Sequence, residues 1–128
     1  MTAYDVVKGH YAASERGDLA GMLGVLADDA TWTECDGTTY AGTYTGVEAI
    51  KENVFFKIGA DWSSFAANVD ELFDAGDTVI ALGRYAGTHR ATGKSMTARF
   101  THIWKVADGK VTSFEQVADS SLILAAES

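Results

Sequence analysis

The chain lacks proline and has a single cysteine among its 128 residues. Without proline there is no stiff spacer of the kind that separates modules, and the lone thiol, Cys35, can form neither an intrachain disulfide nor a multi-thiolate metal site. No apolar run reaches the roughly 18 residues of a membrane span, and Asp5 falls where a secretory signal would be apolar. These absences favour a single domain over residues 1–128 and a reducing, cytoplasmic location.

Positive charge is also scarce. Ten Lys and Arg stand against eighteen Asp and Glu, which gives a net charge of -8, although 47% of the residues are apolar and can form a core. Such a surface repels phosphate backbones and anionic headgroups, so neither nucleic acid nor a membrane is an expected partner. The P-loop, GxGxxG, GxSxG and HExxH motifs are all missing. We therefore expect no metal and no organic cofactor.

The first half of the chain has a helical period. Apolar spacing predicts a helix over residues 3–16, and Asp18 can cap a second helix over 19–26. A short strand is expected at 30–35 because of its aromatic and Thr content. Thr45–Glu48 has the form of a capping box and predicts a third helix. The apolar stripes of the second and third helices are Leu19, Met22, Leu23 and Leu26, and Ile50, Val54, Phe55 and Ile58.

The second half changes to the period of a sheet. Four segments rich in β-formers, joined by three tight turns, predict an antiparallel meander, and a short closing helix is expected after them. The strands are 64–74, 78–89, 95–106 and 111–118, and the helix is 120–126. Gly83 and Gly87 interrupt the second strand, either to bend the sheet around a pocket or to admit a large neighbour. Helices followed by strands predict an α+β fold with helices on one face of a bent sheet.

Alternation sorts the strand residues into two faces. The more apolar face of the 95–106 strand carries Ala98, Phe100, His102 and Trp104, and the matching faces of its neighbours carry Phe114 with Gln116 and Trp32 with Glu34. The inward face thus brings Glu34, His102 and Gln116 among aromatic rings. Desolvation would raise the pKa of a carboxyl there toward the range of a general acid or base.

Structural roles for these three side chains stay open. Glu34 could reach solvent at its strand end, His102 could be a core histidine satisfied by a carbonyl, and Gln116 could bond a neighbouring loop. His10 could point into the pocket mouth from the first helix, whereas His89 lies by a hairpin turn and is expected in solvent. Tyr11, Tyr40, Tyr44 and Tyr85 are possible hydrogen-bond donors.

Several short strings, taken together and in order, resemble the nuclear transport factor 2-like superfamily, in its SnoaL-like and ketosteroid-isomerase-related branch. They are Gly17-Asp18-Leu19, Leu26–Thr31, Gly46–Ile50, Asp108–Val111 and Phe114–Asp119. The resemblance implies a cone-shaped α+β barrel, in which a strongly curved antiparallel sheet wraps around a pocket closed by the N-terminal helices. It also implies a homodimer through the outer sheet face, where Thr101 and Ile103 point.

The resemblance also places functional residues. Glu34 occupies the position of the ketosteroid isomerase base, His10 that of the first-helix tyrosine that stabilises the oxyanion, with Tyr11 one residue away. The second oxyanion donor falls at Thr101 or His102. Because neither donor is of the family's type, steroid isomerisation itself is disfavoured. Limonene-type epoxide hydrolases need an Arg and two Asp where this chain has Gly83, Tyr85 and Gln116, which argues against that chemistry.

Two functions follow as hypotheses. The first is a cofactor-independent isomerase or cyclase that moves a proton on a small, apolar, carbonyl-bearing molecule, with Glu34, His102 and Gln116 as catalytic residues. The substrate-binding residues would be His10, Trp32, Tyr85, Phe100, Trp104 and Phe114. The second is a non-catalytic protein that binds a small apolar ligand, or a dimeric accessory module. If aromatic side chains filled the pocket, both pocket functions would fail.

Overall fold

The computed structural model describes all residues from Met1 to Ser128. The chain begins with helices α1 (Ala3–Glu15) and α2 (Leu19–Gly24) and strands β1 (Leu26–Glu34) and β2 (Gly42–Thr45). A helical stretch follows as α3 (Val47–Ile50), η1 (Lys51–Phe55) and α4 (Phe56–Asp61). The rest is β3 (Trp62–Ala75), β4 (Thr78–His89), β5 (Ser95–Ala107), β6 (Lys110–Ala118) and helix α5 (Ser120–Glu127). No helix combines the length and apolar character that crossing a membrane takes.

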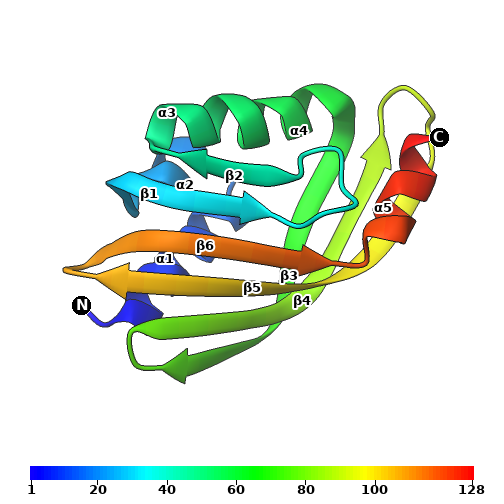
Figure 1. The fold of residues 1–128 in the computed structure, drawn as a ribbon. Helices are drawn as coiled ribbons and strands as arrows, with labels where there is room; N and C mark the ends of the chain where they lie inside the picture. Colours follow the sequence, from blue (N-terminus) through cyan, green and yellow to red (C-terminus); the bar gives the residue numbers. More distant parts are fainter.

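The six strands form one open sheet in the order β2-β1-β6-β5-β4-β3. Strands β3 to β6 pair antiparallel with their sequence neighbours, as the meander predicts, whereas β1 lies parallel to β6. Figure 1 shows the sheet strongly curved, with α1 and α2 behind it and α5 at one end. Helix α1 packs across β3 to β6. The predicted α+β cone with a curved antiparallel sheet is confirmed.

The first two helices differ from prediction at one boundary. Helix α1 has the expected buried face, and the Asp18 carboxylate caps α2 by accepting from the Gly21 backbone N–H. The prediction that α2 runs to Leu26 was wrong, because α2 ends at Gly24 and Leu26 begins β1, opposite Val111 of β6. Pairing with a strand 85 positions further along the chain overrides the local helical spacing, a common outcome of tertiary contact.

The expected capping box at Thr45–Glu48 is not formed. Gly46 is the N-cap of α3, with φ of 92° and no side-chain hydrogen bond. Thr45 instead ends β2 and lies opposite Thr31 of β1, and the Gly46 N–H donates to the Ala30 carbonyl. A left-handed φ favours glycine at this turn. The helical stretch then continues without interruption to Asp61, and β3 starts at Trp62, two residues earlier than expected.

Two glycines let β3 and β4 approach closely. A Cβ at Gly83 would lie 2.2 Å from the Asn68 carbonyl oxygen and 2.6 Å from the Phe100 ring, and one at Gly87 would lie 2.7 Å from the Ser64 carbonyl oxygen. Tight packing is therefore why side chains are missing at both positions. The strand bends here as well, because β3 carries a register shift between Val69 and Glu71, opposite Gly83.

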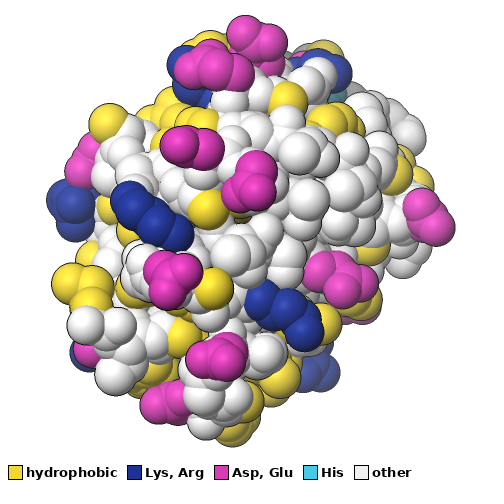
Figure 2. Space-filling view, turned by 60° about the vertical axis from the view of Figure 1, so that its left-hand side comes forward, with side chains coloured by type: hydrophobic (Ala, Val, Ile, Leu, Met, Phe, Trp, Pro, Cys, Tyr) yellow, Lys and Arg dark blue, Asp and Glu magenta, His cyan; other side chains and the backbone are white.

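The ion pairs of the protein lie on its surface. The three ion pairs, Arg16–Asp18, Lys51–Glu48 and Arg84–Asp70, each have at least one exposed member, and such pairs add little stability. Figure 2 shows Asp and Glu spread over the face in view, with Lys and Arg between them. The fold therefore rests on its apolar core and its sheet. Trp104, Ile50 and Val7 are the largest of the fully buried side chains.

Candidate functional site

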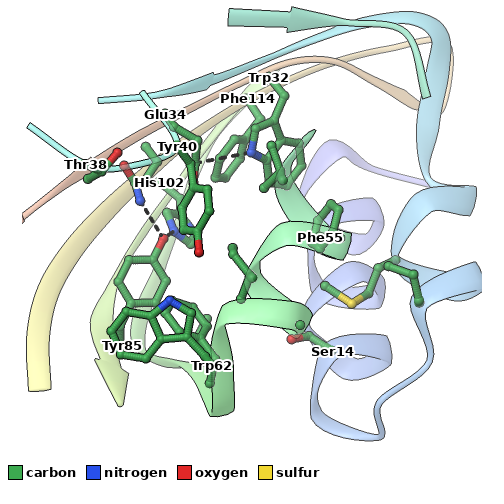
Figure 3. Close-up of a pocket in the computed structure, with 18 of the residues that line it drawn as sticks. Ser14, Trp32, Glu34, Thr38, Tyr40, Phe55, Trp62, Tyr85, His102 and Phe114 are labelled. Atoms are coloured by element: carbon green, nitrogen blue, oxygen red, sulfur yellow. Dashed lines mark hydrogen bonds between the residues drawn. The ribbon is translucent and has the colours of Figure 1, made fainter. Parts of the chain in front are cut away.

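A cavity of about 490 Å³ opens between the curved sheet and the helices. This volume lies within the range of about 300–1,000 Å³ that small-molecule sites have. Figure 3 shows Glu34, His102 and Tyr85 along one wall, with Phe55 and Ser14 across from them. Aromatic side chains therefore do not fill the pocket. Of the predicted site residues, the cavity is lined by Glu34, His102, Gln116, His10, Trp32, Tyr85, Trp104 and Phe114.

Glu34 ends β1 with its carboxyl inside the molecule. Only 6% of the residue is exposed, so it does not reach solvent beside Asp36. Its single hydrogen bond comes from the Trp32 indole N–H, at 3.3 Å from Oε2. Burial raises the pKa of Glu34 to about 8, and the Trp32 hydrogen bond opposes that rise only in part. A carboxyl with this pKa can both accept and return a proton near neutral pH.

His102 is held between two tyrosine hydroxyls. Its Nδ1 lies 2.6 Å from Tyr11 Oη and its Nε2 lies 2.6 Å from Tyr85 Oη. The ring is stacked on Phe100, with centroids 3.9 Å apart. Burial lowers the pKa of His102 well below its ordinary value, which keeps the imidazole neutral. Both ring nitrogens are therefore satisfied by side chains, not by the carbonyl that a core histidine often uses.

The two tyrosine hydroxyls are held in turn by other side chains. Trp104 Nε1 donates to Tyr11 Oη at 2.9 Å, and Gln116 Nε2 donates to Tyr85 Oη at 3.3 Å. Burial raises the pKa of Tyr11 and of Tyr85 above their ordinary values, so both phenols are protonated. The wall is therefore a continuous hydrogen-bonded chain from Trp104 to Gln116 whose members are all neutral.

Gln116 has both a loop contact and a contact in the site. Its Oε1 accepts from the Cys35 backbone N–H at 3.2 Å, which leaves the amide nitrogen directed at Tyr85. The loop contact is the structural role that stayed open from the sequence, and it also fixes which end of the amide faces the cavity. Gln116 thereby orients Tyr85, while the Cys35 thiol is free and half-buried.

His10 and Tyr11, the two residues at or beside the position of the family's first-helix tyrosine, make different contacts. The His10 Nδ1–H donates to the Met22 carbonyl at 3.1 Å, and burial lowers the pKa of His10 to about 4. His10 lines the cavity but is bonded to the backbone of α2. Tyr11, one residue on, carries the hydroxyl that joins the His102 chain. The hydroxyl that reaches His102 therefore comes from Tyr11 and not from His10, the residue at the position that resembles the family's tyrosine.

Comparison with known proteins identifies the family. The SnoaL-like domain model matches residues 7–114. The chain belongs to the SnoaL-like family. An NTF2-like protein of Burkholderia thailandensis is 45% identical, with 100% of this chain and 98% of that one covered and a TM-score of 0.97. A second, of unknown function, from Burkholderia pseudomallei is 26% identical over 100% and 99%, with a TM-score of 0.91.

A more distant structure shares the fold alone. IdmH of Streptomyces antibioticus, described as a candidate polyketide cyclase, is 23% identical, with 98% of this chain and 97% of that one covered and a TM-score of 0.81. No curated protein matches the chain. The shared fold does not assign this SnoaL-like protein an activity, because one fold hosts many activities.

Phe100 is the one predicted site residue that does not line the cavity. It lies behind the wall, stacked on His102 and 4.5 Å from the Tyr85 ring between centroids. Alternation along β5 predicts its inward direction but not its depth, since Gly83 opens the space that its ring occupies. Phe100 therefore supports the SnoaL-like pocket from outside.

Other residues of the cavity wall are not among the predicted site residues. Trp62, Phe55 and Arg90 line the cavity, as does Tyr40, whose hydroxyl donates to Asp61 at 2.7 Å. From the sequence Tyr40 is a possible hydrogen-bond donor, and in the structure its burial together with the Asp61 carboxylate raises its pKa. The apolar stripe of the third helix signals Phe55, but Trp62 and Arg90 carry no signal before the chain is folded.

His89 differs from its predicted solvent position. Its ring stands edge-on to Trp62, with centroids 5.0 Å apart, and its Nδ1 is buried without a hydrogen-bond partner. The β4–β5 turn folds this histidine back over the start of β3, opposite Trp62 in the strand register. Elsewhere, no three His, Cys, Asp or Glu side chains gather as a metal site would require.

Proposed function

We propose that this SnoaL-like protein binds a small, apolar, carbonyl-bearing molecule and moves a proton on it, as an isomerase or cyclase does. The observation that carries the proposal is the buried Glu34 carboxyl on the same cavity wall as the Tyr11–His102–Tyr85 chain. A general base and hydroxyl donors facing one cavity are what the removal of a proton next to a carbonyl requires.

The proposed step begins with Glu34 ionised. Its carboxylate takes a proton from the carbon beside the carbonyl, and the electron pair of that C–H bond moves to give an enolate. The hydroxyl wall stabilises the negative oxygen, and Glu34 then returns the proton to the same or a conjugated carbon. Because burial sets the Glu34 pKa at about 8, about one tenth of the protein is in the active form at pH 7.

His102 and Gln116 support this step through the tyrosines. Both nitrogens of His102 are occupied by Tyr11 and Tyr85, and Gln116 holds Tyr85 from the other side. They are therefore positioning residues, while Trp32, Trp104 and Phe114 supply the apolar walls. We propose that a tyrosine hydroxyl of this chain contacts the substrate oxygen.

The test is exchange in heavy water. With 2-tetralone and 3-cyclohexen-1-one as substrates, we expect the protein to accelerate the loss of the proton signals beside the carbonyl, measured by NMR against buffer alone. Binding is followed in parallel by the fluorescence of Trp32, Trp62 and Trp104, which line the cavity. Ketones that change the fluorescence but exchange no faster than in buffer would contradict catalysis.

A second candidate is a binding protein without chemistry. It is favoured by how little charge the cavity wall carries. Glu34 is mostly protonated at pH 7, which leaves Arg90 as the charged side chain of the wall. Such a wall suits a neutral ligand. Mass spectrometry of the purified protein under native conditions would then show a bound apolar compound, and the exchange assay would show no acceleration.

We also propose a homodimer through the outer sheet face. Thr101 and Ile103 of β5 point outward, and Val117 of β6, opposite Thr101, is 49% exposed. Light scattering should give a mass twice that of the 13.6 kDa chain, and Val117→Glu should shift it toward the monomer by burying a charge. A monomer mass for the unmodified protein at working concentration overturns the proposal.

A further inference from the structure

The contacts around His102 allow its protons to be counted. A neutral imidazole has one N–H and one lone pair, and His102, 4% exposed, has no carboxylate among its hydrogen-bond partners to stabilise a charged ring. Tyr11, Tyr85 and the ring together bring three protons: two on hydroxyls and one on nitrogen. The two contacts to His102 use one proton each. One hydroxyl proton is therefore left over.

No protein acceptor takes this remaining proton. The other hydrogen bonds at these hydroxyls come from donors, Trp104 Nε1–H at Tyr11 and Gln116 Nε2–H at Tyr85. Those donors occupy acceptor positions of the oxygens and leave the hydroxyl hydrogen unused. Both tyrosines line the cavity. A buried hydroxyl without an acceptor is unfavourable, and an oxygen atom of a bound molecule would relieve it.

Which tyrosine has the free proton depends on the tautomer of His102. If Nδ1 carries the hydrogen, it donates to Tyr11, Tyr85 donates to Nε2, and the Tyr11 hydroxyl is free. If Nε2 carries the hydrogen, it donates to Tyr85, Tyr11 donates to Nδ1, and the Tyr85 hydroxyl is free. The two hydroxyls thus cannot both donate into the cavity while the ring is neutral.

We propose that the Tyr11–His102–Tyr85 chain is a binding site for one acceptor oxygen, at which the bound molecule selects the tautomer of His102. The site rests on the proposed function in that the oxygen is the carbonyl of the same substrate. The ligand class is thereby narrowed to molecules that present a hydrogen-bond acceptor here. The tautomer of His102 determines which of the two tyrosine hydroxyls donates to that acceptor.

The first test uses variants and no ligand. In Tyr85→Phe the ring keeps only Tyr11 as partner, and an orphaned N–H is avoided if Nδ1 carries the hydrogen and donates to it. In Tyr11→Phe the same reasoning places the hydrogen on Nε2. Nitrogen NMR of 15N-histidine-labelled protein distinguishes a protonated from a bare ring nitrogen. Opposite tautomers support the chain, whereas the same tautomer in both variants, or a charged ring at pH 7, overturns it.

The second test uses a matched pair of probes. Cyclohexanone and methylenecyclohexane differ in having an oxygen or a CH₂ group at one position, so only the ketone can accept a hydrogen bond. At saturating concentration, cyclohexanone should shift the unmodified protein toward one His102 tautomer, and methylenecyclohexane should leave the ring nitrogen signals unchanged. An equal response to both probes, or no response to the ketone, overturns the site.

These tests separate this site from the proposed catalysis. The nitrogen signals report where a proton rests and do not depend on turnover. If the ketone fixes the tautomer but no proton beside its carbonyl exchanges, the acceptor site stands and the catalytic proposal fails. If exchange occurs while the two tyrosine variants share a tautomer, catalysis stands and the proton count is wrong.

Discussion

Glu34→Gln is expected to reduce proton exchange on the ketone substrates by about 10²–10⁴-fold, the usual contribution of a general base. Glutamine has nearly the shape of glutamate, and its amide oxygen can still accept the Trp32 indole N–H that glutamate accepts at 3.3 Å. What it lacks is an oxygen basic enough to take a proton. Ligand binding, followed by tryptophan fluorescence, should change little. The measurement is the NMR exchange rate at saturating ketone.

Glu115→Gln is the matched control for this variant. Glu115 lies on β6 opposite Thr33, next to the position of Glu34, and its side chain is exposed on the other face of the sheet. The same chemical change there should leave exchange within twofold of the unmodified protein. Exchange by Glu34→Gln above one tenth of the normal rate, or an equal loss in Glu115→Gln, would contradict the role of Glu34 as base.

The strands were predictable because their period is local. Strand β4 has the predicted bounds, Thr78–His89, and β5 and β6 differ by one residue. The alternation along β5 correctly puts His102 and Trp104 on the buried face. This works because a half-buried antiparallel strand shows its two faces in consecutive residues. Turn residues then fix where each strand ends.

The first half was harder because its pairing is distant in sequence. The segment Gly42–Thr45 is a strand only because it pairs with β1, and Leu26 leaves the helical pattern only because β6 lies beside it. Neither segment has the alternation that marks a half-buried strand. Local spacing therefore favoured a longer second helix and gave no strand signal at residues 42–45, and the sheet contacts outweigh that preference.

The site was predictable in its residues but not in its connections. The two-residue rule places Glu34 beside Trp32, and the same rule brings His102 inward. The partner of His102 on α1 is 91 positions away, and no local pattern shows whether His10 or Tyr11 reaches it. Helix rotation by one residue, about 100°, decides between them, and only the packing of α1 on the sheet sets that rotation.

The second large effect is on stability as a function of pH. Burial raises the folded-state pKa of Glu34 from 4.5 to about 8. Between these two pH values the folded state keeps a proton that the unfolded state loses, so the free energy of unfolding falls as pH rises. The slope is about 1.4 kcal/mol per pH unit, and the full loss above pH 8 is on the order of 5 kcal/mol.

Two buried histidines act in the opposite direction. Burial lowers the pKa of His10 from 6.5 to about 4 and that of His102 well below its ordinary value. As pH falls below 6.5, the unfolded chain gains protons at these positions that the folded chain does not take up. Stability therefore falls on the acid side too, and with two histidines against one glutamate the net slope reverses near pH 6.5.

We therefore expect the free energy of unfolding, measured in urea by tryptophan fluorescence, to peak near pH 6.5 and to fall toward pH 8. In Glu34→Gln the alkaline decline should disappear, because the amide stays neutral, while the acid limb from His10 and His102 remains. Glu115→Gln should follow the unmodified protein. A flat or rising curve between pH 6.5 and 8 for the unmodified protein would show that the folded chain does not hold the Glu34 proton.

If Glu34→Gln gives both the expected loss of exchange and the expected pH profile of unfolding, one substitution removes exchange and stabilises the protein above pH 8. A carboxyl kept in the core at such a cost in stability is better explained by its chemistry than by packing, since glutamine fills the same space without that cost.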